Sequence, residues 1–135
     1  MAKEALLIVD MSNDFVADDG TLTVGQPGQK IVPYIIDVAN RFLDEEKIVV
    51  VAMDAHQPND PHFELWPPHN VVGTSGQELY GELQEWFQKN EAHENLIYIP
   101  KPNYNAFFKT GLAEKLRGLG AVSYTHLTLP TICSV

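Results

Sequence analysis

Two uninterrupted apolar runs constrain what this chain can fold into more than any other feature of its sequence. They cover Ala5–Asp10 and Ile48–Asp54, are rich in Ile and Val, and each ends on an aspartate. β-Branched runs without polar alternation are typical of parallel strands that are covered on both faces. The shorter run Leu96–Ile99 indicates a third strand of the same kind.

Apolar residues at helical spacing predict helices between and after these strands, over Ile31–Leu43, Gln77–Lys89 and Leu112–Arg117. Strands that alternate with helices imply right-handed crossovers. The sequence therefore predicts an α/β fold, a three-layer α/β/α sandwich around a mostly parallel, doubly wound sheet. Two long loops remain, Val16–Gly28 and Ala55–Gly76. A loop as long as the second in a small domain is usually functional.

The charge balance and the cysteine count limit the partners and the compartment. The 135 residues contain nine Lys and Arg against eighteen Asp and Glu, a net charge of -9. Such a surface repels phosphate backbones and anionic lipids, so we expect neither nucleic acid nor membrane partners. The single cysteine excludes an internal disulfide framework, and the simplest location for the protein is cytoplasmic.

Three chemically useful side chains stand at the predicted strand ends. Asp10 and Asp54 close the first two strands, and Lys101 follows the third. Ligands bind beyond the carboxyl ends of the strands in open parallel sheets, so we expect these side chains to converge on one edge. The alternative is structural, because Asp often caps the turn or helix that follows a strand.

A second group of polar side chains begins at Asp54 and continues into the long loop. His56 lies two residues after Asp54, and His62, Glu64 and His69 follow. A carboxylate with several imidazoles is a good ligand set for Zn²⁺, Fe²⁺ or Mn²⁺. We therefore predict a divalent metal site, against the alternative that the loop histidines are simply solvated.

Aromatic side chains lie beside these polar positions in the sequence. Phe15, Phe63, Trp66 and Tyr104 could line a small apolar pocket for a flat ligand. The alternative is that these rings only pack the loops onto the sheet.

Five short motifs follow one another along the chain. They are Leu7-Ile8-Val9-Asp10-Met11-x-Asn13-Asp14-Phe15, Asp54-Ala55-His56, Trp66-Pro67-Pro68-His69-Asn70, Gly73-Thr74-x-Gly76 and Lys101-Pro102-x-Tyr104-x-Ala106-Phe107. This ordered set covers roughly residues 4–120 and resembles the isochorismatase-like cysteine hydrolases. Within that family, the Asp-x-His and Trp-Pro-Pro-His motifs together are most similar to those of nicotinamidases.

The resemblance implies a Cys-Asp-Lys triad that hydrolyses nicotinamide to nicotinic acid and ammonia. The cysteine, here Cys133, attacks the amide carbonyl and forms a thioester. Asp10 is then the general base that takes the thiol proton, while Lys101 keeps Asp10 ionised and favours the thiolate by its charge. These roles agree with thiol chemistry, because the thiolate is the nucleophile.

The resemblance also implies a metal site and a small-molecule partner. The expected ligands of the divalent metal, zinc or else iron or manganese, are Asp54, His56, His69 and, as an additional ligand, His62. The metal orients the pyridine ring of nicotinamide through its nitrogen. Phe15 and Trp66 would hold the ring between them, with Tyr104 nearby. Members of the family are often oligomers, so a homo-oligomer is the expected protein assembly.

The end of the chain departs from the family pattern. Family members carry the nucleophile in a Gly-Val-x-Thr-Asp-x-Cys type of segment, whereas Cys133 follows Leu129-Pro130-Thr131-Ile132. Residues 122–135 contain no Asp, Glu, Lys or Arg and are similar to translated read-through of a sequencing adapter. We therefore expect residues 1–121 to be the N-terminal part of the hydrolase domain, incomplete at its C-terminus, and residues 122–135 to be a foreign tail.

Two other functions remain open from the sequence. A family member that cleaves a vinyl ether or a carbamoyl group, an isochorismatase or a carbamoyl amidase, would keep the same fold. The metal set argues against isochorismatase, because a metal that binds a ring nitrogen has no use there. The chain could also be an inactive, metal-binding fragment that releases no ammonia.

Overall fold

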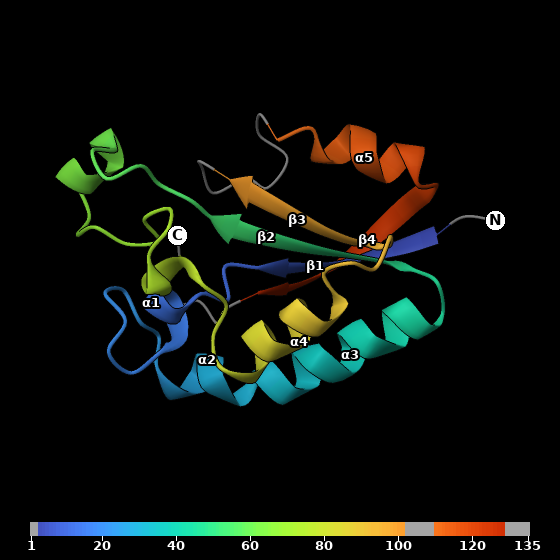
Figure 1. Ribbon diagram of the computed structural model, residues 1–135, viewed down its shortest axis with the longest axis horizontal. Helices are drawn as coiled ribbons and strands as arrows, with labels where there is room; N and C mark the ends of the chain where they lie inside the picture. Colours follow the sequence, from blue (N-terminus) through green and yellow to red (C-terminus); the bar gives the residue numbers. More distant parts are fainter. Residues whose placement is uncertain (1–2, 102–109, 129–135) are drawn as a thin grey trace.

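Four parallel strands form a single sheet in the computed structural model, which describes residues 3–101 and 110–128. The strands are β1 (Lys3–Val9), β2 (Ile48–Asp54), β3 (Leu96–Lys101) and β4 (Ala121–Thr128). Their order across the sheet is β3-β2-β1-β4, so later strands lie on both sides of β1 (Figure 1). The three strands predicted from the apolar runs are confirmed, and β3 continues to Lys101.

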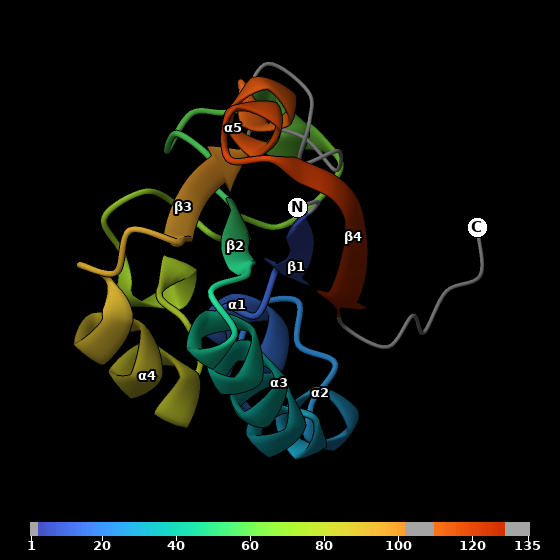
Figure 2. The same cartoon turned by 90° about the vertical axis from the view of Figure 1, so that its right-hand side faces the viewer.

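Helices cover the sheet on both faces. α3 (Val32–Asp44) and α4 (Glu82–Asn90) lie side by side on one face, and α5 (Leu112–Gly118) lies on the other (Figure 1, Figure 2). Two short helices, α1 (Asn13–Val16) and α2 (Gln26–Lys30), follow β1. The expected α/β/α sandwich with a parallel sheet is therefore confirmed. Within the described residues, no helix has both the length and the apolar character needed to cross a bilayer.

Alternate residues of the central strands face opposite sides of the sheet, which explains why their sequences carry no polar position. Leu6 and Ile8 of β1 belong to the larger core, shared with α3 and α4, whereas Ala5 and Leu7 belong to a smaller core shared with α5. All four side chains are fully buried. Each buried Leu or Ile contributes about 1.5–3 kcal/mol relative to an exposed one, so the central strands stabilise both layers.

The helix predicted over Gln77–Lys89 is wrong at its start. Residues Ser75–Gln77 form a short 3₁₀ turn, η2, and α4 begins only at Glu82. Between the two, Leu79 pairs in an antiparallel bridge with Ser12. This long-range pairing keeps the segment extended, and a helical period in the local sequence does not reveal it.

The two predicted loops also contain short helical turns. α2 begins inside the predicted loop Val16–Gly28, and the 3₁₀ turn η1 (Pro61–Glu64) lies inside the predicted loop Ala55–Gly76. Each of these turns is too short for its hydrophobic period to stand out from the surrounding sequence.

All of β4 except its first residue, Ala121, lies in the segment that is expected from the sequence to be foreign. It runs parallel to β1, with Lys3 opposite Ala121 and Val9 opposite Thr128, and it ends two residues before Pro130. The division of the chain at residue 121 stays a prediction.

Candidate functional site

The carboxyl ends of β1, β2 and β3 bring two carboxylates and a lysine to one edge of the sheet. Asp54 and Lys101 are opposite each other in the pairing of β2 with β3. Asp10 follows β1 directly, and its N–H donates to the Ala52 carbonyl of β2 at 2.9 Å. The three strand-end residues named from the sequence therefore lie together.

Asp10 and Lys101 form an ion pair in which the lysine is fully buried. Lys101 Nζ lies 3.0 Å from each oxygen of the Asp10 carboxylate. The Lys101 side chain is 1% exposed, and that of Asp10 is 21% exposed. Burial raises the pKa of Asp10 above its ordinary value, and the charge and hydrogen bond of Lys101 offset this only in part. Asp10 therefore holds a proton more readily than an exposed aspartate does.

Asp10 has a left-handed backbone conformation, with φ of 60°. Such values are uncommon outside glycine and cost about 1–3 kcal/mol. Oδ1 of Asp10 accepts the backbone N–H of Asp54 at 3.0 Å, in addition to its contact with Lys101. These two partners hold the strained residue in place and fix the direction of its carboxylate.

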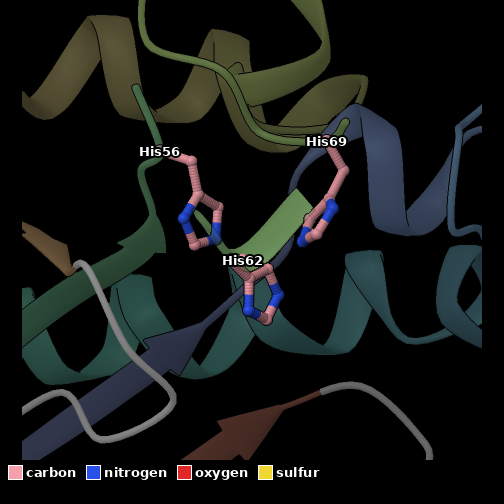
Figure 3. Close-up of side chains that lie close together, drawn as sticks. All are labelled: His56, His62 and His69. Carbon is pink, nitrogen blue, oxygen red and sulfur yellow. The ribbon is translucent and has the colours of Figure 1, made fainter. Parts of the chain in front are cut away.

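Three histidines from the loop after β2 lie beside this pair. Figure 3 shows His56, His62 and His69 around a common space, and one ring nitrogen of each lies within 4.8 Å of the others. Asp54 Oδ2 lies 2.8 Å from His56 Nε2 and 3.4 Å from His69 Nε2. The residues predicted as metal ligands are thus brought together, in a group that could bind a metal ion.

The hydrogen bonds and the spacing of the rings fit such an ion. Nδ1 of His69 lies 2.7 Å from the Pro67 carbonyl, which only accepts, so Nδ1 carries the proton and Nε2 directs its lone pair toward Asp54. The ring centroids are 4.8, 5.1 and 5.3 Å apart. Imidazoles arranged tetrahedrally about Zn²⁺ would have centroids about 5 Å apart. A divalent ion would bind the Nε2 lone pairs of His56 and His69, which otherwise face the Asp54 carboxylate.

His62 is held in a form that can bind a metal. Its pKa is lowered, first by desolvation and then by the neighbouring His56 and His69. The neutral imidazole that this favours is the form that ligates metals. Its ring is nearly parallel to that of His56, with an angle of 6° between the planes.

Hydrogen bonds at both ends of the loop fix the histidines. The N–H of His56 donates to the Asn70 carbonyl at 3.0 Å. The N–H of Asn70, directly after His69, donates to Asp14 Oδ2 at 2.7 Å, which ties the loop to α1. Asp60 accepts the N–H of His62 at 2.9 Å and lies 2.8 Å from His56 Nδ1.

Gly76 leaves space for the Asp14 carboxylate, so Gly76→Ala is expected to loosen this loop. The added Cβ would overlap the carboxylate, which must then move and lose its bond to Asn70. We expect a loss of about 1–3 kcal/mol of unfolding free energy, measured with urea. Gly118→Ala in α5 is the control, because its Cβ meets nothing within 4 Å. That control should be neutral or slightly stabilising, and equal urea midpoints for the two variants would refute the crowding at Gly76.

Two of the predicted ring-binding residues border the imidazoles. The Phe15 and His69 rings are 5.5 Å apart, and Trp66 lies at 6.5 Å from His62 with an angle of 22° between the planes. The Trp66 side chain is 45% exposed, so one of its faces is accessible to a ligand.

Phe63 also borders the imidazoles, with its ring edge-on to His56 and His69 at 5.4 and 5.6 Å between centroids. The remaining residues named from the sequence do not join the group or cannot be placed in it. Glu64 is exposed at the end of η1. Tyr104 and the candidate nucleophile Cys133 lie outside the described residues.

Two aspartates that hold the site were missed by the sequence analysis. Asp60 had a detectable signal, because Asp followed by Pro is typical of the start of a helical turn. Asp14 stands in the first of the five motifs, but its role could not be found there, because its partner Asn70 lies 56 residues away in the chain.

Comparison with known families and sequences gives a consistent result. A model of the isochorismatase domain matches residues 4–127. An uncharacterized isochorismatase family protein of Bacillus subtilis is 44% identical over 118 residues, which are 85% of this chain and 64% of the relative. The chain therefore spans less than two thirds of the length of that relative.

Solved structures show the same likeness. A pyrazinamidase/nicotinamidase of Streptococcus mutans is 36% identical, with a TM-score of 0.90 over 95% of this chain and 72% of the other. A pyrazinamidase of Pyrococcus horikoshii in complex with zinc is 29% identical, with a TM-score of 0.77 over 96% of this chain and 72% of the other.

Proposed function

We propose that this chain, which belongs to the isochorismatase domain family, is an amidohydrolase of the nicotinamidase type. It would convert nicotinamide to nicotinic acid and ammonia and would use a divalent metal ion. The likeness to the Streptococcus mutans pyrazinamidase/nicotinamidase supports this choice among the reactions of the family.

One observation carries the proposal: the acid–lysine pair and the imidazole group share one edge of the sheet. Lys101 Nζ lies 3.0 Å from Asp10 and 3.9 Å from Asp54 Oδ1. Asp54 faces His56 and His69 with its other oxygen. A group that can move protons thus lies beside a group that could hold a metal ion and, through it, the substrate ring.

Asp10 and Lys101 would handle the protons of a two-step hydrolysis. Asp10 takes the thiol proton of Cys133, and the thiolate attacks the amide carbonyl. The C–N bond breaks, the proton passes from Asp10 to the leaving nitrogen, and ammonia departs from a thioester. Water then attacks the thioester and gives a proton to Asp10, which returns it to the sulfur as nicotinic acid leaves. The raised pKa of Asp10 supports this role, because the group must both accept and return a proton.

The residues that would hold the metal ion are Asp54, His56, His62 and His69. Imidazole and carboxylate ligands suit Zn²⁺ and also Fe²⁺ or Mn²⁺. When bound, the ion supplies a positive centre that orients the pyridine nitrogen. Phe15 and Trp66 border the group and would hold the ring, with Tyr104 as a third contact.

Ammonia release from nicotinamide tests the proposal. The protein is loaded with Zn²⁺, Fe²⁺ or Mn²⁺, and its turnover is compared with that of Cys133→Ala at equal metal content. We expect turnover by the unchanged chain and a loss of about 10³-fold or more in the variant, because removal of a nucleophile abolishes the covalent route. That result would also contradict the expectation that residues 122–135 are a foreign tail. Ser134→Ala, beside the nucleophile, is the matched control and should retain turnover.

Two results would redirect the proposal. Preferential cleavage of isochorismate or of a carbamoyl amide would assign the site to another reaction of the family. A folded, metal-loaded protein that releases no ammonia from nicotinamide would refute the proposed activity and favour an inactive metal-binding fragment.

A further inference from the structure

We propose that Asp60 is the positioning residue that prepares His56 and His62 for the metal ion; this rests on the metal site of the proposed function. One carboxylate contacts both histidines. Its Oδ2 lies 2.8 Å from His56 Nδ1, and its Oδ1 accepts the backbone N–H of His62 at 2.9 Å.

The contact with His56 determines which ring nitrogen is free for a metal. Both ring nitrogens of His56 face a carboxylate, so a metal ion between Nε2 and Asp54 leaves the proton of the neutral imidazole on Nδ1, which donates it to Asp60. Nε2 then keeps its lone pair, 2.8 Å from Asp54 Oδ2. Two acceptors at this distance repel each other unless a proton or a cation lies between them.

The contact with His62 orders the turn on which that residue lies. Asp60 has the extended backbone of a helix N-cap, and Pro61 at the start of η1 favours the same turn. η1 in turn places the His62 ring over His56, with 4.8 Å between centroids.

His69 reaches the same group without Asp60. Its Nδ1 donates to the Pro67 carbonyl at 2.7 Å, so a backbone acceptor fixes its tautomer. Loss of the Asp60 carboxylate should change His56 and His62 and leave His69 in place. The expected result is a weakened metal site.

Asp60→Asn separates positioning from helix capping. Asparagine is as good an N-cap as aspartate, so its side-chain oxygen can still accept the His62 N–H. Its NH₂ group then faces His56 Nδ1 and donates to it, which moves the ring proton to Nε2 and blocks the lone pair. Asp19→Asn removes the same charge at an exposed position and is the matched control.

Two measurements on the full chain test the inference. Competition with a chromophoric chelator gives the Zn²⁺ dissociation constant, and long-range ¹H–¹⁵N spectra of the protein in excess Zn²⁺ show which nitrogen of His56 carries the proton. We expect Zn²⁺ binding roughly 10- to 100-fold weaker in Asp60→Asn. The His56 proton should be on Nδ1 in the wild type and on Nε2 in the variant, and Asp19→Asn should match the wild type in both.

Unchanged Zn²⁺ affinity in Asp60→Asn would overturn the inference. Weaker binding with the same His56 tautomer would also overturn it, because that result indicates a purely structural role. If the variant does not fold, the wild-type spectrum still decides, since a proton on His56 Nε2 contradicts the proposal. A wild-type chain that binds no Zn²⁺ would overturn the inference together with the metal site, whereas Zn²⁺ binding without ammonia release counts against the proposed activity alone.

Discussion

Replacing Lys101 with methionine is expected to destabilise the protein by about 3 kcal/mol and, under the proposed function, to lower nicotinamide hydrolysis by about 10²- to 10⁴-fold. Methionine has a similar volume but leaves the Asp10 carboxylate without the ammonium 3.0 Å away. The stability loss lies at the lower end for a broken buried pair, because 21% of the Asp10 side chain is exposed. Urea unfolding measures the first quantity and ammonia release the second.

Two further variants isolate the ion pair. Asp10→Asn combined with Lys101→Met removes both charges, so most of the lost stability should return while the activity stays absent. Lys47→Met breaks two solvent-accessible pairs, with Glu4 at 3.6 Å and with Glu45 at 3.7 Å, and should cost less than about 1 kcal/mol. Equal stability losses for Lys101→Met and Lys47→Met would show that the buried pair contributes no more to stability than the solvent-accessible pairs do.

Zn²⁺ is expected to stabilise the folded chain by about 4 kcal/mol when its free concentration is about 1,000 times the dissociation constant. The fold gathers ligand atoms that the unfolded chain keeps apart, with His69 Nε2 at 3.4 Å and His56 Nε2 at 2.8 Å from Asp54 Oδ2. EDTA should reverse the effect. His69→Ala removes one of the proposed ligands and should abolish most of the Zn²⁺-dependent shift in thermal unfolding.

His93→Ala is the matched control for the metal experiment. His93 is exposed, and its ring accepts the N–H of Asn95 at 3.0 Å, away from the imidazole group. The variant should lose a little stability with or without metal and keep the full response to Zn²⁺. A response of equal size in the wild type and in His69→Ala would rule out His69 as a ligand.

The strands could be predicted because their burial is a local property of the sequence. β1 and β2 are covered on both faces, so neither needs a polar position, and the apolar runs mark them directly. The start of α4 could not be predicted in the same way. Leu79 is held extended by its bridge to Ser12, and such a contact leaves no local period.

The candidate site divides in the same way, into residues that the fold class predicts and residues whose contacts depend on the folded loop. Asp10, Asp54 and Lys101 could be named together because parallel strands end at one edge, which is a property of the fold class. The aspartates behind the histidines follow from contacts that depend on the folded loop. Asp14 meets the Asn70 N–H only after the loop has returned to α1, and Asp60 shows no sign in the sequence that it also reaches His56.

Asp54 contacts both parts of the candidate site, the Asp10–Lys101 pair and the histidine group. Its backbone N–H donates to Asp10, its Oδ1 lies 3.9 Å from Lys101, and its Oδ2 faces His56. Because β2 ends at this residue, a slip of β2 against either neighbouring strand would displace the Asp10–Lys101 pair and the histidine group together. A change in the sheet therefore cannot move one of them without the other. Changes confined to the loop over residues 55–76, by contrast, can alter the histidine group while Asp10 and Lys101 keep their geometry.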